Sequence, residues 1–295
     1  MKAFQDPGRF FIVGCQRSGT TLLRLVLECH PLVACYDEDT AYKALQEGCR
    51  CPPPGKRLAG FKIPRWTEQL GEPVCRDEGL AETAAGLYQG EPLVFVLRDV
   101  RDVVASMHKL RMTERQTWLE FCARPILEAK LRRPEFRERY APEIAALRAC
   151  GDSPFAAGAL YWKYKTQSVF DYRERGWPVH AVRYEDLVAA PRPELRRLVS
   201  FLGLPWFRGL LSHPDFPHAE IYANGLAMGN TDPKRPIGAD SVGQWRRLLS
   251  SQAEADVLRL AGDLNERVAG LSPPRGVRRV LQSIGRAARR LTAAS

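Results

Sequence analysis

FFIVGCQRSGTTLLRLVLE, residues 10–28, is the stretch that decides the fold of this 295-residue chain. It opens with a bulky apolar run, as a buried central strand does, and ends with apolar residues at helical spacing. Between them, residues 14–19 form a loop with two glycines and an arginine. A turn from a strand into a helix directs backbone N–H groups and the positive end of the helix dipole at an anion. The stretch therefore predicts a phosphate-binding loop, with a glycine turn that binds nothing as the alternative.

The loop departs from the P-loop pattern at one position. Gly14, Gly19 and Thr21 match G-x-x-x-x-G-K-[ST], but Thr20 stands where the lysine is required. Arg17 supplies a positive charge earlier in the loop instead. In a P-loop the lysine reaches the terminal phosphates of a nucleoside triphosphate, so its absence favours a different phosphate-bearing donor.

Strands and helices alternate along the rest of the chain. Apolar runs at 58–62, 93–97 and 179–183 predict strands, and helices are expected at about 100–109 and 191–202. This alternation favours an α/β fold with a doubly wound, mainly parallel central sheet flanked by helices. Ligands of such sheets bind at the carboxyl ends of the strands. Four polar residues fall at or just past these ends, which predicts a site there: Arg17, Lys62, Arg98 and Tyr184.

A second motif, VFVLRDVRDVVASM at residues 94–107, contains two of the expected ligand contacts. Arg98 closes a predicted buried strand, and Ser106 lies two turns into the helix that follows. An arginine at a strand end and a hydroxyl on the helix can hold one phosphate from two sides. Taken alone, Arg98 and the charged residues after it could instead be a surface ion-pair cluster.

The domain expected over residues 1–271 is followed by a basic tail, 272–295. An arginine-rich helical insertion at about 110–160 interrupts the alternation, and we expect either a lid or acceptor-binding wall, or a solvated excursion. The tail holds six arginines and no acid, within a net charge of +10 for the whole chain. Its apolar residues recur at helical spacing, so it could lie on an anionic membrane or dock on its own domain.

The composition favours a cytoplasmic protein with peripheral membrane contact through the tail. The sequence has no run of about 18 apolar residues, and too few residues precede the first strand for a signal peptide. Its eight cysteines form no C-x-x-C pair, so we expect reduced thiols and no zinc site. No nucleic-acid partner is expected, because no recognised binding module accompanies the basic tail.

Together the two motifs resemble those of sulfotransferases that use 3′-phosphoadenosine 5′-phosphosulfate (PAPS). The first loop is similar to their 5′-phosphosulfate motif and residues 94–107 to their 3′-phosphate motif. The tyrosylprotein sulfotransferase-like branch shares RSGTTLLR, the pair His30–Pro31 and an acidic cluster after it. The resemblance covers most of residues 9–271 and implies the P-loop-like sulfotransferase fold, with PAPS as co-substrate and no metal.

The same resemblance implies a role for each matching residue. The loop would wrap the 5′-phosphosulfate through Arg17, Ser18, Gly19, Thr20 and Thr21; the 3′-phosphate and nucleotide would be held by Arg98, Ser106, Tyr184, Lys234 and Arg235. Lys62 matches a lysine near the transferred group, and Glu38 matches the acidic base when no gap is introduced. The local sequence YDEDT differs from the branch pattern, and a one-residue gap would move the base to Asp39, so both stay open.

These residue types suit in-line transfer of a sulfuryl group to an acceptor hydroxyl. Cationic and hydroxyl donors would stabilise charge on the leaving 5′-phosphate, and a carboxylate would accept the hydroxyl proton. The expected products are a sulfate ester on a peptide tyrosine, a saccharide or a small molecule, and 3′-phosphoadenosine 5′-phosphate (PAP). Two alternatives stay open: a nucleotide or small-molecule kinase with a deviant P-loop, and a non-catalytic, membrane-peripheral binding protein on the same fold.

Overall fold

The computed structural model describes residues 8–49, 51–70, 88–151 and 153–271. At its centre lies a five-stranded sheet of order β2-β3-β1-β4-β5, in which every neighbouring pair is parallel. This arrangement confirms the predicted doubly wound parallel sheet. The strands are β1 (Gly8–Val13), β2 (Val33–Tyr36), β3 (Leu58–Lys62), β4 (Leu93–Leu97) and β5 (Val179–Arg183).

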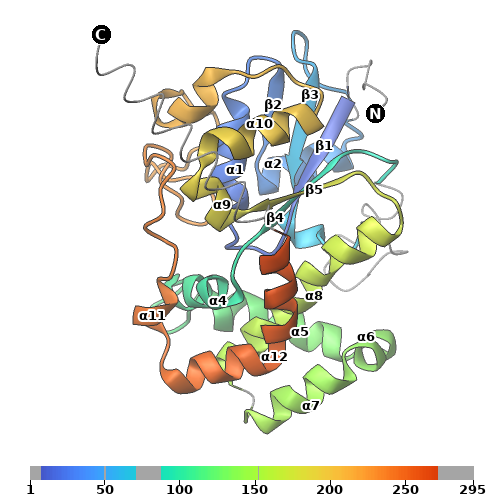
Figure 1. Ribbon diagram of the computed structural model, residues 1–295, viewed down its shortest axis with the longest axis vertical. Coiled ribbons are helices and arrows are strands. Elements are labelled where there is room, and N and C mark those ends of the chain that lie inside the picture. The colour runs from blue at the N-terminus through green and yellow to red at the C-terminus, as the bar shows by residue number, and fades with distance from the viewer. Residues whose placement is uncertain (1–7, 50, 71–87, 152, 272–295) are drawn as a thin grey trace.

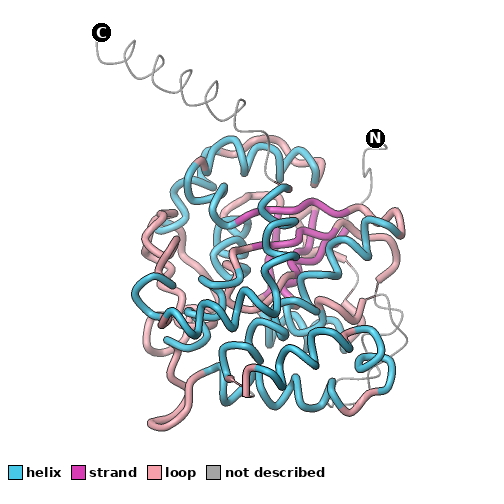
Figure 2. The backbone as a smooth tube through the Cα atoms, turned by 60° about the horizontal axis from the view of Figure 1, so that its bottom comes forward, coloured by secondary structure: helices cyan, strands magenta, loops and turns pink. Residues whose placement is uncertain are grey.

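Helices cover both faces of the sheet, and Figure 2 shows the strands side by side between them. Alternate side chains of a strand point to opposite faces, so each strand contributes to two apolar cores. Phe11 and Phe95 face one core, which also takes side chains from the helices at 38–46, 100–109, 154–174 and 251–270. Phe10 and Val94 face the other, against the helices at 20–28 and 191–201. Because β1 and β4 are buried on both faces, they read as continuous apolar runs rather than alternating ones.

The helices begin with α1 immediately after the first loop. Figure 1 shows α4 to α8 and α12 in one half of the molecule and α1, α9 and α10 against the sheet in the other. The bounds are α1 (Thr20–Glu28), α2 (Glu38–Gln46), α4 (Val100–Lys109), α5 (Arg124–Leu131), α6 (Pro134–Arg139), α7 (Ala141–Ala149), α8 (Pro154–Glu174), α9 (Tyr184–Ala189), α10 (Pro191–Phe201), α11 (Trp245–Leu248) and α12 (Ser251–Gly270).

Shorter turns complete the described chain: the 3₁₀ turn Pro64–Trp66 after β3, the π-helical turn Leu119–Ala123, and the 3₁₀ segment Arg208–Asp215. The insertion predicted at about 110–160 begins as a short bridged loop, with Arg111 paired to Thr117, and becomes helical from residue 119. Leu119, Leu127 and Leu147 are buried in the core that includes α8, so this segment is packed rather than a solvated excursion.

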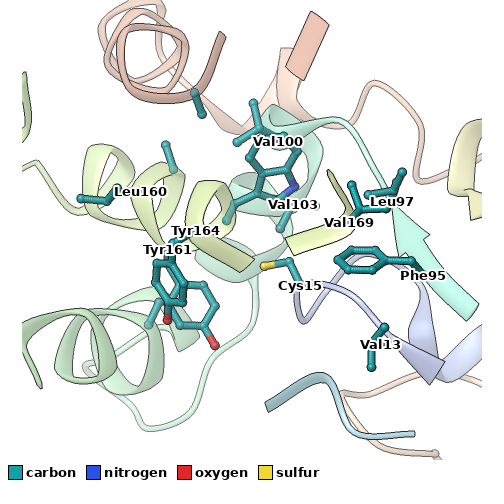
Figure 3. Packing of buried hydrophobic residues seen from close by; sticks show 14 of the residues in the cluster. Val13, Cys15, Phe95, Leu97, Val100, Val103, Leu160, Tyr161, Tyr164 and Val169 are labelled. Carbon is teal, nitrogen blue, oxygen red and sulfur yellow. The ribbon is translucent and has the colours of Figure 1, made fainter. Parts of the chain in front are cut away.

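Cys15 lies two residues after the end of β1, in the core on the α8 side, and Figure 3 shows it among the labelled apolar side chains of that core. Burial in this apolar setting raises the pKa of the thiol well above its ordinary value, so it stays protonated and unreactive at neutral pH.

Within the described ranges, no helix is both long enough and apolar enough to cross a bilayer. The tail at 272–295, predicted to form a basic amphipathic helix, lies outside the described residues.

Candidate active site

Two glycines shape the loop between β1 and α1. Gly14 has a φ of 133°, and a Cβ there would overlap the carbonyl oxygen of Val96 in the adjacent strand. Gly19, which precedes the first residue of α1, has a φ of 101°, and a Cβ there would stand 2.6 Å from the ring of Tyr184. Only glycine satisfies both the backbone conformation and the close approach, so the loop passes tightly under Tyr184.

A Gly19→Ala substitution is expected to destabilise the fold by about 1–3 kcal/mol, because it adds backbone strain and a clash with the Tyr184 ring. Urea unfolding of both proteins measures the difference. Gly176→Ala is the matched control, because Gly176 has a similarly positive φ of 73° and a Cβ added there would meet no described atom within 4 Å. Equal losses in the two variants would show that the Tyr184 contact contributes nothing.

Arg17 joins the loop to two distant segments. Its Nε donates to Ser106 Oγ at 3.1 Å, and its Nη1 donates to the carbonyl oxygen of Gly229 at 2.6 Å. The residue itself has a φ of 72°, a left-handed conformation that is uncommon for arginine. Burial, together with the charge of Arg98, lowers the pKa of Arg17 to about 10, so the guanidinium remains charged at neutral pH.

Arg98, at the end of β4, lies against the same loop. Its Nη1 donates to the Arg17 carbonyl oxygen at 3.1 Å, and its Nη2 donates to the carbonyl oxygen of Ser241. The guanidinium stacks over the Tyr184 ring at 4.4 Å from its centroid. Arg17, Ser106, Arg98 and Tyr184 are therefore brought together, as the sequence predicts.

These side chains face a cavity of about 520 Å³ at the carboxyl ends of the strands. Its described lining is strongly cationic, with Asp232 as the acidic member. Such a lining suits an anionic ligand, and the volume lies in the range of about 300–1,000 Å³ typical of small-molecule sites. The lining includes Arg17, Gly19, Thr20, Thr21, Arg98, Ser106, Lys109, Arg111, Tyr184 and Arg235.

Two of the predicted donor-site residues lie outside the described cavity lining. Ser18 is buried in the loop and is not part of the described lining. Lys234 is exposed and also lies outside that lining, with its N–H donating to Asp232 Oδ1 at 2.9 Å. Its neighbour Arg235 reaches the cavity while forming an ion pair with Asp240 at 2.6 Å. Of these basic neighbours, the geometry therefore favours Arg235.

Lys62 lies behind the cavity wall rather than in it. Its side chain is only 1% exposed. The ammonium donates to Thr21 Oγ1 at 2.9 Å, forms an ion pair with Asp37, and stands 3.8 Å from Glu38 Oε2. Since Thr21 belongs to the cavity lining, Lys62 connects that lining to the acidic cluster.

Asp37 is the centre of this cluster and was not singled out from the sequence. It is the N-cap of α2, where its Oδ1 accepts from the Glu38 N–H at 2.7 Å. Its Oδ2 accepts from Arg24 Nη2 at 2.9 Å. Burial alone would raise the pKa of Asp37, but the charges of Lys62 and Arg24 outweigh it and hold the pKa below its ordinary value. An acid followed by a helical pattern is a capping signal that could have identified this residue.

Glu38 and Asp39, the two candidate bases, differ sharply in their surroundings. Glu38, the first residue of α2, is 8% exposed, whereas Asp39 is exposed. The Tyr42 hydroxyl donates to Glu38 Oε1 at 3.4 Å, and Arg65 Nε stands 3.9 Å from the same oxygen. Burial raises the pKa of Glu38, and the charges of Lys62 and Arg65 partly offset that rise. A carboxylate with a raised pKa is the better proton acceptor, so the geometry favours Glu38.

A further residue missed from the sequence is Asp102 on α4. Its two carboxylate oxygens accept from the N–H groups of Gly243 at 2.7 Å and Trp245 at 3.1 Å. These contacts fix the chain next to Ser241, whose carbonyl oxygen holds Arg98. Over the described ranges, no cluster of three or more His, Cys, Asp or Glu side chains is placed to hold a metal ion.

Curated proteins similar to this chain share one activity in their names. A protein-tyrosine sulfotransferase of Drosophila melanogaster is 23% identical over 285 residues, which cover 86% of this chain and 49% of the relative. Protein-tyrosine sulfotransferase A of Caenorhabditis elegans is 22% identical over 273 residues, covering 84% of this chain and 63% of the relative. The chain therefore spans less than two thirds of the length of either relative.

Two solved structures share the fold. The sulfotransferase domain from the curacin biosynthetic pathway superposes with a TM-score of 0.54 at 17% identity, covering 86% of this chain and 97% of that one. The sulfotransferase domain from the Synechococcus PCC 7002 olefin synthase gives a TM-score of 0.53 at 17% identity, covering 91% and 97%.

The family model described as the sulfotransferase family matches residues 7–68 and 152–208. The first range contains the loop with Arg17 and the Lys62–Asp37–Glu38 cluster, and the second contains Tyr184. The chain is therefore similar to the sulfotransferase family over these two ranges, and the curated proteins that it resembles are named protein-tyrosine sulfotransferases.

Proposed function

We propose that this protein transfers the sulfuryl group of PAPS to a hydroxyl of an acceptor, giving a sulfate ester and PAP. The observation that carries the proposal is the cationic cavity in which the loop after β1 meets Arg98 at the end of β4. Lys62, behind the cavity wall, contacts both Thr21 of the lining and Glu38, which supports a proton acceptor next to the anion site.

The residues present fit a donor with two separate phosphate groups. Ser106 and Arg98 lie on the β4–α4 side of the cavity, and Thr20 and Thr21 begin α1 on the other. Arg98, which belongs to the cavity lining, has a buried Nε with no hydrogen-bond partner among the described residues. Buried polar atoms are almost always hydrogen-bonded in native proteins, so this atom is consistent with a polar ligand contact.

Each residue of the site has a separate role in the proposed sulfuryl transfer. A new bond forms between the acceptor oxygen and sulfur as the bond from sulfur to the 5′-phosphate oxygen breaks, and the electron pair leaves with that phosphate. Arg17 and the hydroxyls of Thr20 and Thr21 would stabilise the developing charge, and Lys62 holds Thr21 in place. The acceptor proton passes to Glu38, whose carboxylate adjoins Lys62.

The acceptor that we propose is a hydroxyl compound, with peptide tyrosine first because the curated relatives are named for tyrosine sulfation. A saccharide or small phenol would use the same base. Assaying radiolabelled PAPS with each of the three acceptor classes, followed by identification of the labelled product, distinguishes them. A kinase would instead transfer label from γ-labelled ATP, and the binding-protein alternative predicts PAP binding with no transfer.

Arg17→Ala and Arg98→Ala are each expected to weaken PAP binding by about tenfold to a hundredfold, because each removes charge-assisted hydrogen bonds to a phosphate. Isothermal calorimetry on the purified variants measures the change. Arg124→Ala is the matched control, since Arg124 lies outside the described cavity lining and forms a half-exposed i,i+4 ion pair with Glu128 at 3.0 Å. Unchanged affinity in both site variants would overturn the PAPS assignment.

A further inference from the structure

A long irregular segment, residues 216–244, connects the two halves of the site; we call it the strap. Its Gly229 carbonyl oxygen accepts from Arg17, and its Ser241 carbonyl oxygen accepts from Arg98. Residues between 229 and 244 line the donor cavity. The strap therefore forms one wall of the cavity and accepts hydrogen bonds from both Arg17 and Arg98.

The beginning of the strap is attached to two helices on the other side of the site. His218 Nδ1 lies 2.7 Å from Glu28 Oε2 at the end of α1. Two residues on, Glu220 Oε2 accepts from the backbone N–H of Asp37 at 3.0 Å and from Thr40 Oγ1 at 2.6 Å. Glu220 thus reaches the N-terminus of α2, the helix that begins with Glu38.

These contacts reproduce the second half of a capping box from a distant part of the chain. In a capping box, the N-cap side chain accepts from the N–H of the third helical residue, and an acidic or amide residue at that position accepts from the N-cap N–H. Asp37 Oδ1 accepts instead from the N–H of the first helical residue, Glu38. The third helical position is Thr40, whose hydroxyl donates its one proton to Glu220 Oε2 and does not accept from the Asp37 N–H. Glu220 supplies the missing acceptor.

We propose that Glu220 is a positioning residue that caps α2 from the strap and thereby sets the position of Glu38 relative to the donor cavity. The inference rests on the proposed function, because Glu38 is the proton acceptor only in that reaction. The strap that places Glu220 on α2 also accepts hydrogen bonds from Arg17 and Arg98. Glu220 therefore connects the helix that carries Glu38 to the segment that lines the donor cavity. Glu220 touches neither the cavity lining nor Glu38 among the described contacts, which makes it a positioning rather than a catalytic residue.

Kinetics of three variants test the role. Glu220→Ala is expected to lower kcat about tenfold to a hundredfold, because small misplacements of a catalytic group have effects of that size. The KM for PAPS is expected to change less than about threefold, since the donor contacts remain. Glu220→Gln retains an oxygen acceptor and should keep most of the wild-type kcat. The double variant Glu220→Ala with Thr40→Glu builds the capping box within α2 and should recover kcat.

The matched control is Asp215→Ala, which removes an exposed carboxylate five residues earlier in the chain. A loss of kcat in Glu220→Ala no larger than in this control would overturn the proposal. So would a Glu220→Gln variant as impaired as Glu220→Ala, because the cap requires only an acceptor oxygen.

Hydrogen exchange separates this inference from the proposed function, because it needs no turnover. The Asp37 amide, which donates to Glu220, and the Ala41 amide, which donates to the Asp37 carbonyl oxygen, are expected to exchange at least about tenfold faster in Glu220→Ala than in the wild type or Glu220→Gln, since loss of a cap frays a helix end. Unchanged exchange would overturn the capping role. Faster exchange in a protein whose wild type transfers no sulfuryl group would uphold the cap and remove the proposed reaction.

Discussion

Glu38→Gln is expected to lower kcat for sulfuryl transfer by about 10²–10⁴-fold, the usual contribution of a general base. Asp39→Asn is expected to stay within about threefold of the wild type, because Asp39 is exposed on the second position of α2. Steady-state assays with saturating PAPS and acceptor measure both values. Glutamine is nearly isosteric with glutamate, so the loss reports the missing base rather than altered packing.

The pH profile offers an independent check of the same residue. Burial raises the pKa of Glu38, and a base acts only in its ionised form, so kcat should fall as the pH drops through that raised pKa. Glu38→Gln should lose this acidic limb and Asp39→Asn should keep it. A large loss confined to Asp39→Asn would assign the base to Asp39 instead, as the alignment with a one-residue gap allows.

The strands that the sequence predicted correctly are those with the strongest apolar signal. Residues 58–62, 93–97 and 179–183 form β3, β4 and β5 with the predicted bounds, and α4 spans 100–109 as expected. The prediction missed β2, because VACY is a short edge strand with only alternate residues buried. A strand of four residues is too short to show a clear period in its hydrophobic residues.

The missed helices have a different cause. The start of α2 is an acidic cluster for which the sequence analysis predicted no helix, although acids favour the first turn of a helix. Helix α12, at residues 251–270, has a regular amphipathic pattern that the prediction passed over. The sequence therefore contained a helix signal at both places, an acidic first turn in α2 and an amphipathic pattern in α12.

The sequence predicted the site residues that follow strong strands, but not the contacts of the strap. Arg17 and Arg98 each lie shortly after a strong strand, so a parallel sheet must bring them to one edge. The bond from Arg17 to Gly229 spans 212 residues of sequence, and that from Glu220 to Asp37 spans 183. The strap has no periodic pattern, so its contacts depend on tertiary packing that local sequence does not encode.

Asp37→Ala is expected to be the most destabilising single change at the site, lowering the free energy of unfolding by about 3–5 kcal/mol at pH 7. The substitution leaves the buried cations of Lys62 and Arg24 without their shared carboxylate and removes the N-cap of α2. Removing one partner of a buried ion pair costs more than the pair contributes, because the remaining charge is desolvated and uncompensated. Urea unfolding measures the loss, and Asp39→Ala, at an exposed position of the same helix, is the matched control.

The pH dependence of that loss identifies its electrostatic part. The folded-state pKa of Asp37 is lowered, so its ionised form contributes stability above the unfolded pKa of about 4, and this contribution is lost as the pH falls through the folded pKa. The difference in unfolding free energy between wild type and Asp37→Ala should therefore shrink as the pH drops below about 4. Asp37→Asn, which keeps an acceptor oxygen for the N-cap, should lose mainly this pH-dependent part. A pH-independent difference would mean that Asp37 acts through the cap alone, with Lys62 and Arg24 stabilised by other groups.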